Sequence, residues 1–252
     1  MSAWWRTPPA RLSAPPSTSA PASAQWVNLP KAPNLAAPAP KTPDGKPDLS
    51  GVWMADGQIY FMDLAAGLKP GDVVMLPWAS AEQRRRFAND HGDDPLARCL
   101  PHGVPRINTN GLFPLKIVQT RTGVVILYEQ MNLFRQIFMD GRTLANDVNP
   151  TWLGYSTGRW DGDTLVVDTS GFNGKAWLDT RVGRPATDAL HVTERFHRKN
   201  TGTLEVTATI DDRKTYAKPW TTTTQTFHLQ PTTDILEFVC AENEKDAPHM
   251  PR

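Results

Sequence analysis

Glu194 is the residue whose setting in the sequence most strongly indicates chemistry. It lies in one of two alternating segments joined by the turn Asn200-Thr201-Gly202. A three-residue loop makes Ala208 the cross-strand partner of Glu194 and gives both residues the same face. The rest of that face is apolar: Val192, Phe196, Leu204, Val206 and Ile210. A carboxylate in these surroundings must be paired, hydrogen-bonded or protonated.

Two roles for Glu194 follow from this position. It could donate or accept a proton on a bound molecule. Alternatively, it could form a salt bridge with an inward-facing arginine, Arg135 or Arg159. If Met131-Asn132 is a two-residue turn, Tyr128 lies opposite Arg135, and that arginine could stabilise developing negative charge. The candidate catalytic residues are Glu194, Tyr128, Arg135, Tyr155 and Asp168.

The last predicted hairpin supplies candidate ligand contacts. Gln225 shares a strand face with Phe227, and their predicted neighbours across the turn are Leu236 and Phe238. A polar group among aromatic side chains is typical of a mostly apolar pocket with a few placed hydrogen bonds. We therefore expect a small apolar or aromatic molecule as partner. The candidate ligand-binding residues are Trp152, Phe196, Gln225 and Phe227.

Other chemical motifs are weaker. The G-x-S-x-G pattern at residues 154–158 suits a serine hydrolase only on a strand–turn–helix elbow, whereas here it runs into a predicted hairpin. The six histidines show no H-x-H or H-E-x-x-H spacing, and residues 89–94 lack the closing glutamate of an EF-hand. We expect neither a metal nor another cofactor.

Composition narrows the class of protein. The chain has 252 residues and a net charge of +1, which gives no electrostatic reason to expect nucleic acid as a partner. No apolar stretch reaches the roughly 20 residues of a membrane helix, and 39% hydrophobic residues suffice for a core. The two cysteines, Cys99 and Cys240, are predicted to form a disulfide in an oxidising compartment. The alternative is two buried thiols.

The elements that position these residues are mainly strands. One helix is predicted over residues 80–89, where Ser80 and Gln83 form a capping box. After a first strand from residue 49, short turns separate the candidate strands 115–120, 123–130, 133–139, 152–160, 164–170, 191–199, 203–211, 219–229 and 234–240. Successive strands with short turns favour an all-β, up-and-down antiparallel barrel of about 8–9 strands, because closure removes sheet edges.

The domain boundaries follow from proline content. Eleven of the 23 prolines precede residue 49, so residues 1–48 are predicted to be a flexible or extended tail. Trp4, Trp5 and Trp26 leave open that this tail wraps the domain. The barrel is expected over residues 49–245, with a helical and loop insertion at about 65–114, and residues 246–252 form a C-terminal tail.

Two resemblances add to this interpretation. Gly51-Val52-Trp53 is similar to the G-x-W of the first strand of lipocalins and other calycins. This resemblance implies a barrel that binds apolar molecules, and some calycin relatives are cofactor-independent cyclases and hydratases. A longer resemblance over residues 42–246 is to an uncharacterised group of exported bacterial proteins. Its segments are TPDGKPDLSGVW (42–53), GRWDGDTLVVDT (158–169) and LHVTERF (190–196).

The longer resemblance implies an extracytoplasmic protein. Ala22-Ser23-Ala24 looks like a small-residue cleavage site, although no apolar segment precedes it. The expected function is binding of a small apolar or aromatic molecule in the barrel with acid–base chemistry of the lyase, isomerase, hydratase or cyclase type. The alternatives are a non-catalytic ligand-binding protein with the same cavity, or a structural domain whose barrel is filled by side chains. The oligomeric state stays unknown.

Overall fold

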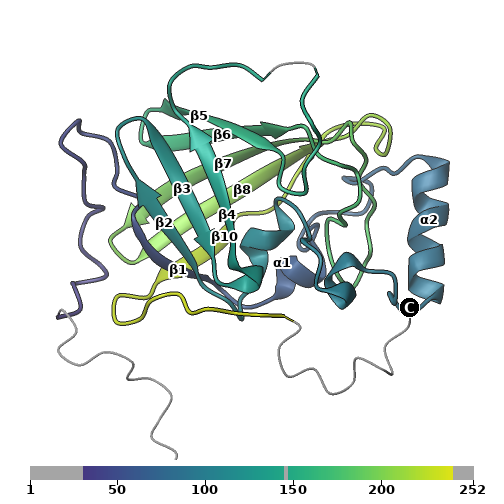
Figure 1. The fold of residues 1–252 in the computed structure, drawn as a ribbon, viewed down its shortest axis with the longest axis horizontal. Helices are drawn as coiled ribbons and strands as arrows, with labels where there is room; N and C mark the ends of the chain where they lie inside the picture. Colours follow the sequence, from purple (N-terminus) through teal and green to yellow (C-terminus); the bar gives the residue numbers. More distant parts are fainter. Residues whose placement is uncertain (1–30, 145–146, 241–252) are drawn as a thin grey trace, which may run out of the picture. The chain divides into compact units, whose positions relative to one another are not determined.

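A closed barrel of nine strands is the main feature of the computed structural model, which describes residues 31–144 and 147–240 (Figure 1). The strands follow one another around the sheet from β1 to β8, and β10 pairs with both β8 and β1 to close it. The short strand β9 pairs with β8 beside the closure. The strands are β1 (Gly51–Ala55), β2 (Leu115–Gln119), β3 (Gly123–Tyr128), β4 (Leu133–Phe138), β5 (Tyr155–Asp161), β6 (Thr164–Ser170), β7 (His191–Asn200), β8 (Thr203–Asp211), β9 (Trp220–Thr221) and β10 (Gln225–Leu229). The predicted all-β barrel is confirmed.

One strand pair differs from the predicted antiparallel order. β4 and β5 are parallel, and their ladder joins only Ile137 to Ser156 and Phe138 to Thr157. A closed ring of nine strands cannot alternate direction at every step, so at least one neighbouring pair must be parallel. In this chain the parallel pair is β4 and β5, and the connection between them allows both strands to run in the same direction.

The β7–β8 hairpin has the predicted register. Glu194 pairs with Ala208, and the ladder becomes irregular only between Arg198 and Asn200, next to the turn. The predicted inward face is buried, with Val192 and Ile210 fully enclosed. Strict alternation fixes this register because a shift by one residue would bury the opposite, polar face.

The predicted strand at 234–240 does not form. Residues 231–240 run beside the turn after β3, where Asn132 and Glu129 bond the backbone of Phe238 and Leu236. β10 already closes the barrel by pairing with both β8 and β1, so residues 234–240 have no place in the ring of strands. The predicted neighbourhood of Gln225 with Leu236 and Phe238 is therefore wrong. The predicted strand at 219–229 is divided into β9 and β10.

The helices also differ in detail from the prediction. The helix α2 (Pro77–Ala88) begins three residues before the predicted start, with Pro77 in its first turn and Leu76 as N-cap. Proline suits the first helical position because its missing N–H has no partner there anyway. Ser80 therefore lies inside the helix rather than at its cap. The short helix α1 (Ile59–Met62) was not predicted.

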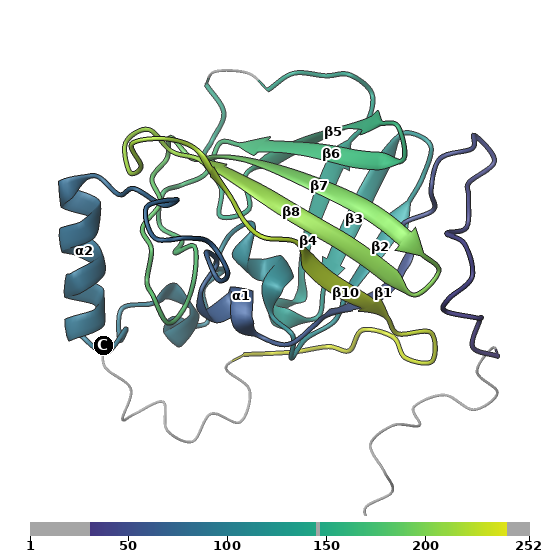
Figure 2. The same ribbon diagram turned by 180° about the vertical axis from the view of Figure 1, so that it is seen from behind.

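The end of the barrel beside α1 is filled by chain from the insertion (Figures 1 and 2). Residues 102–110, which we call the plug, are all buried and include the 3-10 helix η2 (Arg106–Thr109). Val104 and Ile107 of the plug belong to the same hydrophobic core as the inward residues of the strands. The other 3-10 helices are η1 (Pro95–Arg98) and η3 (Gln130–Asn132).

The predicted disulfide is confirmed. Cys99 and Cys240 are bonded, with their Cα atoms 5.7 Å apart and 141 positions apart in sequence. The bond joins the segment before the plug to the segment after β10. It therefore fastens both irregular segments to one another across the end of the barrel.

The described part of the predicted N-terminal tail contacts the barrel. The backbone N–H groups of Thr201 and Gly202, in the β7–β8 turn, donate to the carbonyl oxygens of Ala37 and Leu35. Residues 31–48 are thus bound to the barrel rather than separate from it. Trp4, Trp5, Trp26 and residues 246–252 lie outside the described residues. Within residues 31–144 and 147–240, no helix is long and apolar enough to cross a membrane.

Candidate functional site

The inner face of the barrel contains a buried ion pair between Glu194 on β7 and Arg135 on β4. Arg135 Nη2 donates to Glu194 Oε2 at 2.5 Å, and both side chains are at most 1% exposed. Although burial opposes the charged form, the carboxylate of Glu194 raises the pKa of Arg135. The second role predicted for Glu194, a salt bridge with an inward arginine, is therefore the one that the structure contains.

Arg135 also connects β4 to strands with which β4 has little or no backbone pairing. Its Nε donates to Ser156 Oγ on β5 at 2.9 Å, and Nη2 donates to Thr169 Oγ1 on β6 at 2.7 Å. One side chain thus joins β4 to β5, β6 and β7. Its Nη1 is buried and has no hydrogen-bond partner among the described residues.

The plug completes this arrangement. Asn108 Nδ2 donates to Glu194 Oε1 at 2.6 Å, and the Tyr128 hydroxyl donates to Asn108 Oδ1 at 2.7 Å. Burial raises the pKa of Tyr128 well above its ordinary value, so the phenol stays neutral. We call Glu194, Arg135, Asn108, Tyr128, Ser156 and Thr169 the internal polar network.

Tyr128 enters this network by a different geometry from the predicted one. η3 replaces the expected two-residue turn, so Tyr128 pairs with Leu133 and Arg135 pairs with Ile126. Tyr128 and Arg135 still point into the same interior because inward residues alternate along both strands. Arg159, the other arginine considered for Glu194, lies on the outer face and bonds Asp168.

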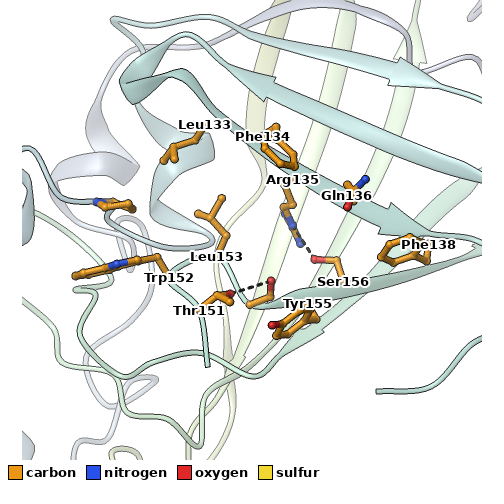
Figure 3. A pocket seen from close by; sticks show the side chains of 12 residues that line it. Leu133, Phe134, Arg135, Gln136, Phe138, Thr151, Trp152, Leu153, Tyr155 and Ser156 are labelled. Atoms are coloured by element: carbon orange, nitrogen blue, oxygen red, sulfur yellow. Dashed lines mark hydrogen bonds between the residues drawn. The ribbon is translucent and has the colours of Figure 1, made fainter. Parts of the chain in front are cut away.

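A cleft of about 400 Å³ lies in the barrel wall where β4 and β5 diverge (Figure 3). Its walls are mainly apolar and aromatic: Leu133, Phe134, Phe138, Trp152, Leu153 and Tyr155. Figure 3 shows Arg135 crossing from β4 to Ser156 on β5, and both residues belong to the lining. The cleft thus combines an aromatic wall with the edge of the internal polar network.

A smaller pocket of about 200 Å³ adjoins this cleft on the outer face of β5, β6 and β7. The two share Phe138, Tyr155 and Ser156. Asp168 and His191 line the smaller pocket, with His191 Nε2 3.5 Å from Asp168 Oδ1. This pocket is the more polar part of a continuous lining, and its titratable side chains reach solvent.

The sequence-predicted residues therefore divide into three groups. Glu194, Tyr128 and Arg135 meet in the internal polar network, whereas Trp152, Tyr155 and Asp168 line the two outer pockets. Phe196, Gln225 and Phe227 are buried in the barrel interior and line neither pocket. Gln225 pairs with Val206, and its Nε2 has no partner among the described residues.

Several site residues were not foreseen. Asn108 lies in a loop without periodicity, so no sequence signal places it against Glu194. Phe134 and Phe138 alternate on a predicted strand, and this alternation could have placed them on one face. The β7–β8 register also puts His191 on the outward face, but nothing in the sequence indicates that Asp168 of β6 lies beside it.

No family model matches the chain, and no curated protein matches it. Among the described residues, no group of three or more histidine, cysteine, aspartate or glutamate side chains is arranged to hold a metal ion.

Proposed function

We propose that the protein binds a small, largely apolar or aromatic molecule in the cleft between β4 and β5. The observation that carries this proposal is a cleft of about 400 Å³ with four aromatic side chains in its lining. That volume lies within the range of small-molecule sites, which are mostly apolar with a few placed polar groups. Phe134 is 60% exposed although it is large and apolar, as expected of a wall that a ligand covers.

The internal polar network supports binding rather than proton transfer by Glu194. Both oxygens of its carboxylate accept hydrogen bonds, from Asn108 and Arg135, and the side chain is fully enclosed. A general base must reach the proton that it abstracts, directly or through one water. We propose that Glu194 is the counter-ion of Arg135 and keeps the guanidinium in place behind the cleft.

The location and kinship of the protein are part of the same proposal. The Cys99–Cys240 disulfide supports maturation in an oxidising, extracytoplasmic compartment, because such bonds rarely persist in a reducing cytosol. A calycin relationship is supported by the position of the G-x-W segment at the first barrel strand. There Trp53 is fully buried, and Arg198 stacks over its ring at 4.9 Å.

Binding can be tested with N-phenyl-1-naphthylamine, a neutral apolar probe whose fluorescence rises in apolar surroundings. We expect saturable binding that weakens at least about tenfold in Trp152→Ala and in Phe134→Ala, which corresponds to about 1.4 kcal/mol. The control is Phe87→Ala, which removes an exposed aromatic ring from α2. Equal affinity in all three variants and the unchanged protein would show that the probe does not bind in the cleft.

A further inference from the structure

The smaller pocket brings together three side chains that can act in sequence on an ester: a hydroxyl, an imidazole and a carboxylate. Ser170, His191 and Asp168 all line it. The ladder between β6 and β7 ends at the pair of Thr169 with Val192, and continuing its register by one step sets Ser170 opposite His191. At the spacing of directly opposed residues, with Cβ atoms about 4.5–5.5 Å apart, a rotation of the two side chains suffices to form a serine–histidine hydrogen bond.

Asp168 is held so that it can orient the imidazole. Its Oδ1 accepts a hydrogen bond from Thr193 at 2.7 Å and lies 3.5 Å from His191 Nε2, while Arg159 bonds Oδ2. Burial works against the charged carboxylate, but the hydrogen bonds from Thr193 and Arg159 lower the pKa of Asp168. The carboxylate is therefore ionised at neutral pH, and its partners fix its orientation.

We propose that Ser170, His191 and Asp168 form a nucleophile–base–carboxylate site that hydrolyses small esters with an apolar or aromatic acyl group. The placement of the acyl group rests on the proposed function, because it assigns this group to the adjoining cleft. The catalytic part rests only on the smaller pocket. Ser156, the serine of the G-x-S-x-G pattern, is 1% exposed and bonded to Arg135, so it is not the nucleophile.

The proposed ester hydrolysis proceeds through an acyl group on Ser170 and uses only side chains and water. Ser170 Oγ attacks the carbonyl carbon while His191 Nδ1, the nitrogen that does not face Asp168, accepts its proton, and Asp168 stabilises the resulting imidazolium. The alcohol departs with that proton and leaves an ester of Ser170. Water then attacks this acyl group, gives a proton to His191, and the carboxylic acid is released as Ser170 recovers its proton.

Arg142 is the arginine in the lining of this pocket, and in the proposed reaction it would stabilise the developing oxyanion. It lines the same pocket, its guanidinium stacks on Phe138 at 3.9 Å, and its Nε and Nη2 bond Asp140. The guanidinium is thereby fixed at the pocket rim, where it can stabilise a negatively charged oxygen. Thr157 lines the same pocket and adds a hydroxyl donor.

The first test is labelling with a biotin-bearing alkyl fluorophosphonate, followed by mass spectrometry of the labelled peptide. An activated serine forms a bond to phosphorus, and fluoride leaves. We expect the label on Ser170, no label in Ser170→Ala, and at least a 100-fold slower reaction in His191→Gln. The matched control is His197→Gln, an exposed histidine on the same face of β7, which should react like the unchanged protein. Thermal unfolding of each variant confirms that it is folded.

An unlabelled Ser170 in the folded protein would overturn the catalytic site, as would labelling that persists at the same rate in His191→Gln. The second test compares p-nitrophenyl benzoate with p-nitrophenyl acetate. We expect the benzoate preference to fall at least about tenfold in Trp152→Ala. If Ser170 is labelled but Trp152→Ala leaves the preference unchanged, the acyl group does not occupy the cleft. If the apolar probe binds the cleft but Ser170 is not labelled, the binding function survives without this site.

Discussion

Replacing Glu194 by glutamine tests the role of the buried ion pair most directly. The substitution keeps the shape of the side chain and its ability to accept a hydrogen bond from Asn108. It removes the negative charge that faces Arg135, whose side chain is only 1% exposed. The guanidinium is then left charged and without its counter-ion in the barrel interior.

The expected loss of stability is large. Removing one partner of a buried ion pair typically costs about 3–5 kcal/mol, because the remaining charge stays desolvated. Arg135 keeps its bonds to Ser156 and Thr169, but both of these acceptors are neutral hydroxyls. For a domain of this size each kcal/mol corresponds to about 2–4 °C in Tm, so Glu194→Gln should lower Tm by roughly 6–20 °C.

The assay is thermal and urea unfolding followed by circular dichroism. The control is Glu205→Gln, which removes the partner of Lys199 from an ion pair whose lysine is 61% exposed. Such a pair contributes at most about 1 kcal/mol, so Tm should change by no more than a few degrees. If Glu194→Gln unfolds within about 2 °C of the unchanged protein, the counter-ion argument is wrong and a proton-transfer role for Glu194 regains support.

Two further predictions concern other parts of the fold. Replacing Cys99 and Cys240 by serine should lower the free energy of unfolding by about 5 kcal/mol on the chain-entropy estimate, because the bond closes a loop across 141 positions; unchanged urea unfolding would contradict this. Burial, with a smaller contribution from Arg106, lowers the pKa of His102 to about 3. Since this folded-state pKa lies below the unfolded value of about 6.5, the stabilisation is complete above pH 6.5 and is lost as the pH falls toward 3. Between pH 7.5 and pH 5 the loss should be about 2 kcal/mol, and it should be missing in His102→Gln but present in the exposed-site control His228→Gln.

The parts of the fold that could be predicted from sequence depend on local patterns. The β7–β8 register follows from strict alternation on both sides of a short turn, and this alternation placed Glu194 correctly beside Ala208. The pairing of Cys99 with Cys240 was the one intramolecular bridge that two cysteines allow. The first inference needs only residues close together in the sequence, and the second needs only the number of cysteines.

The rest depends on contacts between distant segments. The network around Arg135 joins β4, β5, β6, β7 and the plug, and no periodicity in any one of them indicates the others. Residues 234–240 have the pattern of a strand, but β10 already closes the ring of strands by pairing with both β8 and β1. The parallel pairing of β4 with β5 follows from the number of strands in the ring, which alternation along one strand cannot reveal.

The short ladder between β4 and β5 also determines where the barrel opens locally. Two residue pairs hold these strands by backbone contact, so opening fluctuations should cost least free energy at this junction, and its amide protons should exchange with solvent early. Arg135 opposes this opening, because its hydrogen bond to Ser156 joins the two strands on the inner face of the barrel. Opening at this junction would break two backbone pairs and the hydrogen bond from Arg135 to Ser156. A molecule seated in the adjoining cleft would brace both strands and slow that exchange.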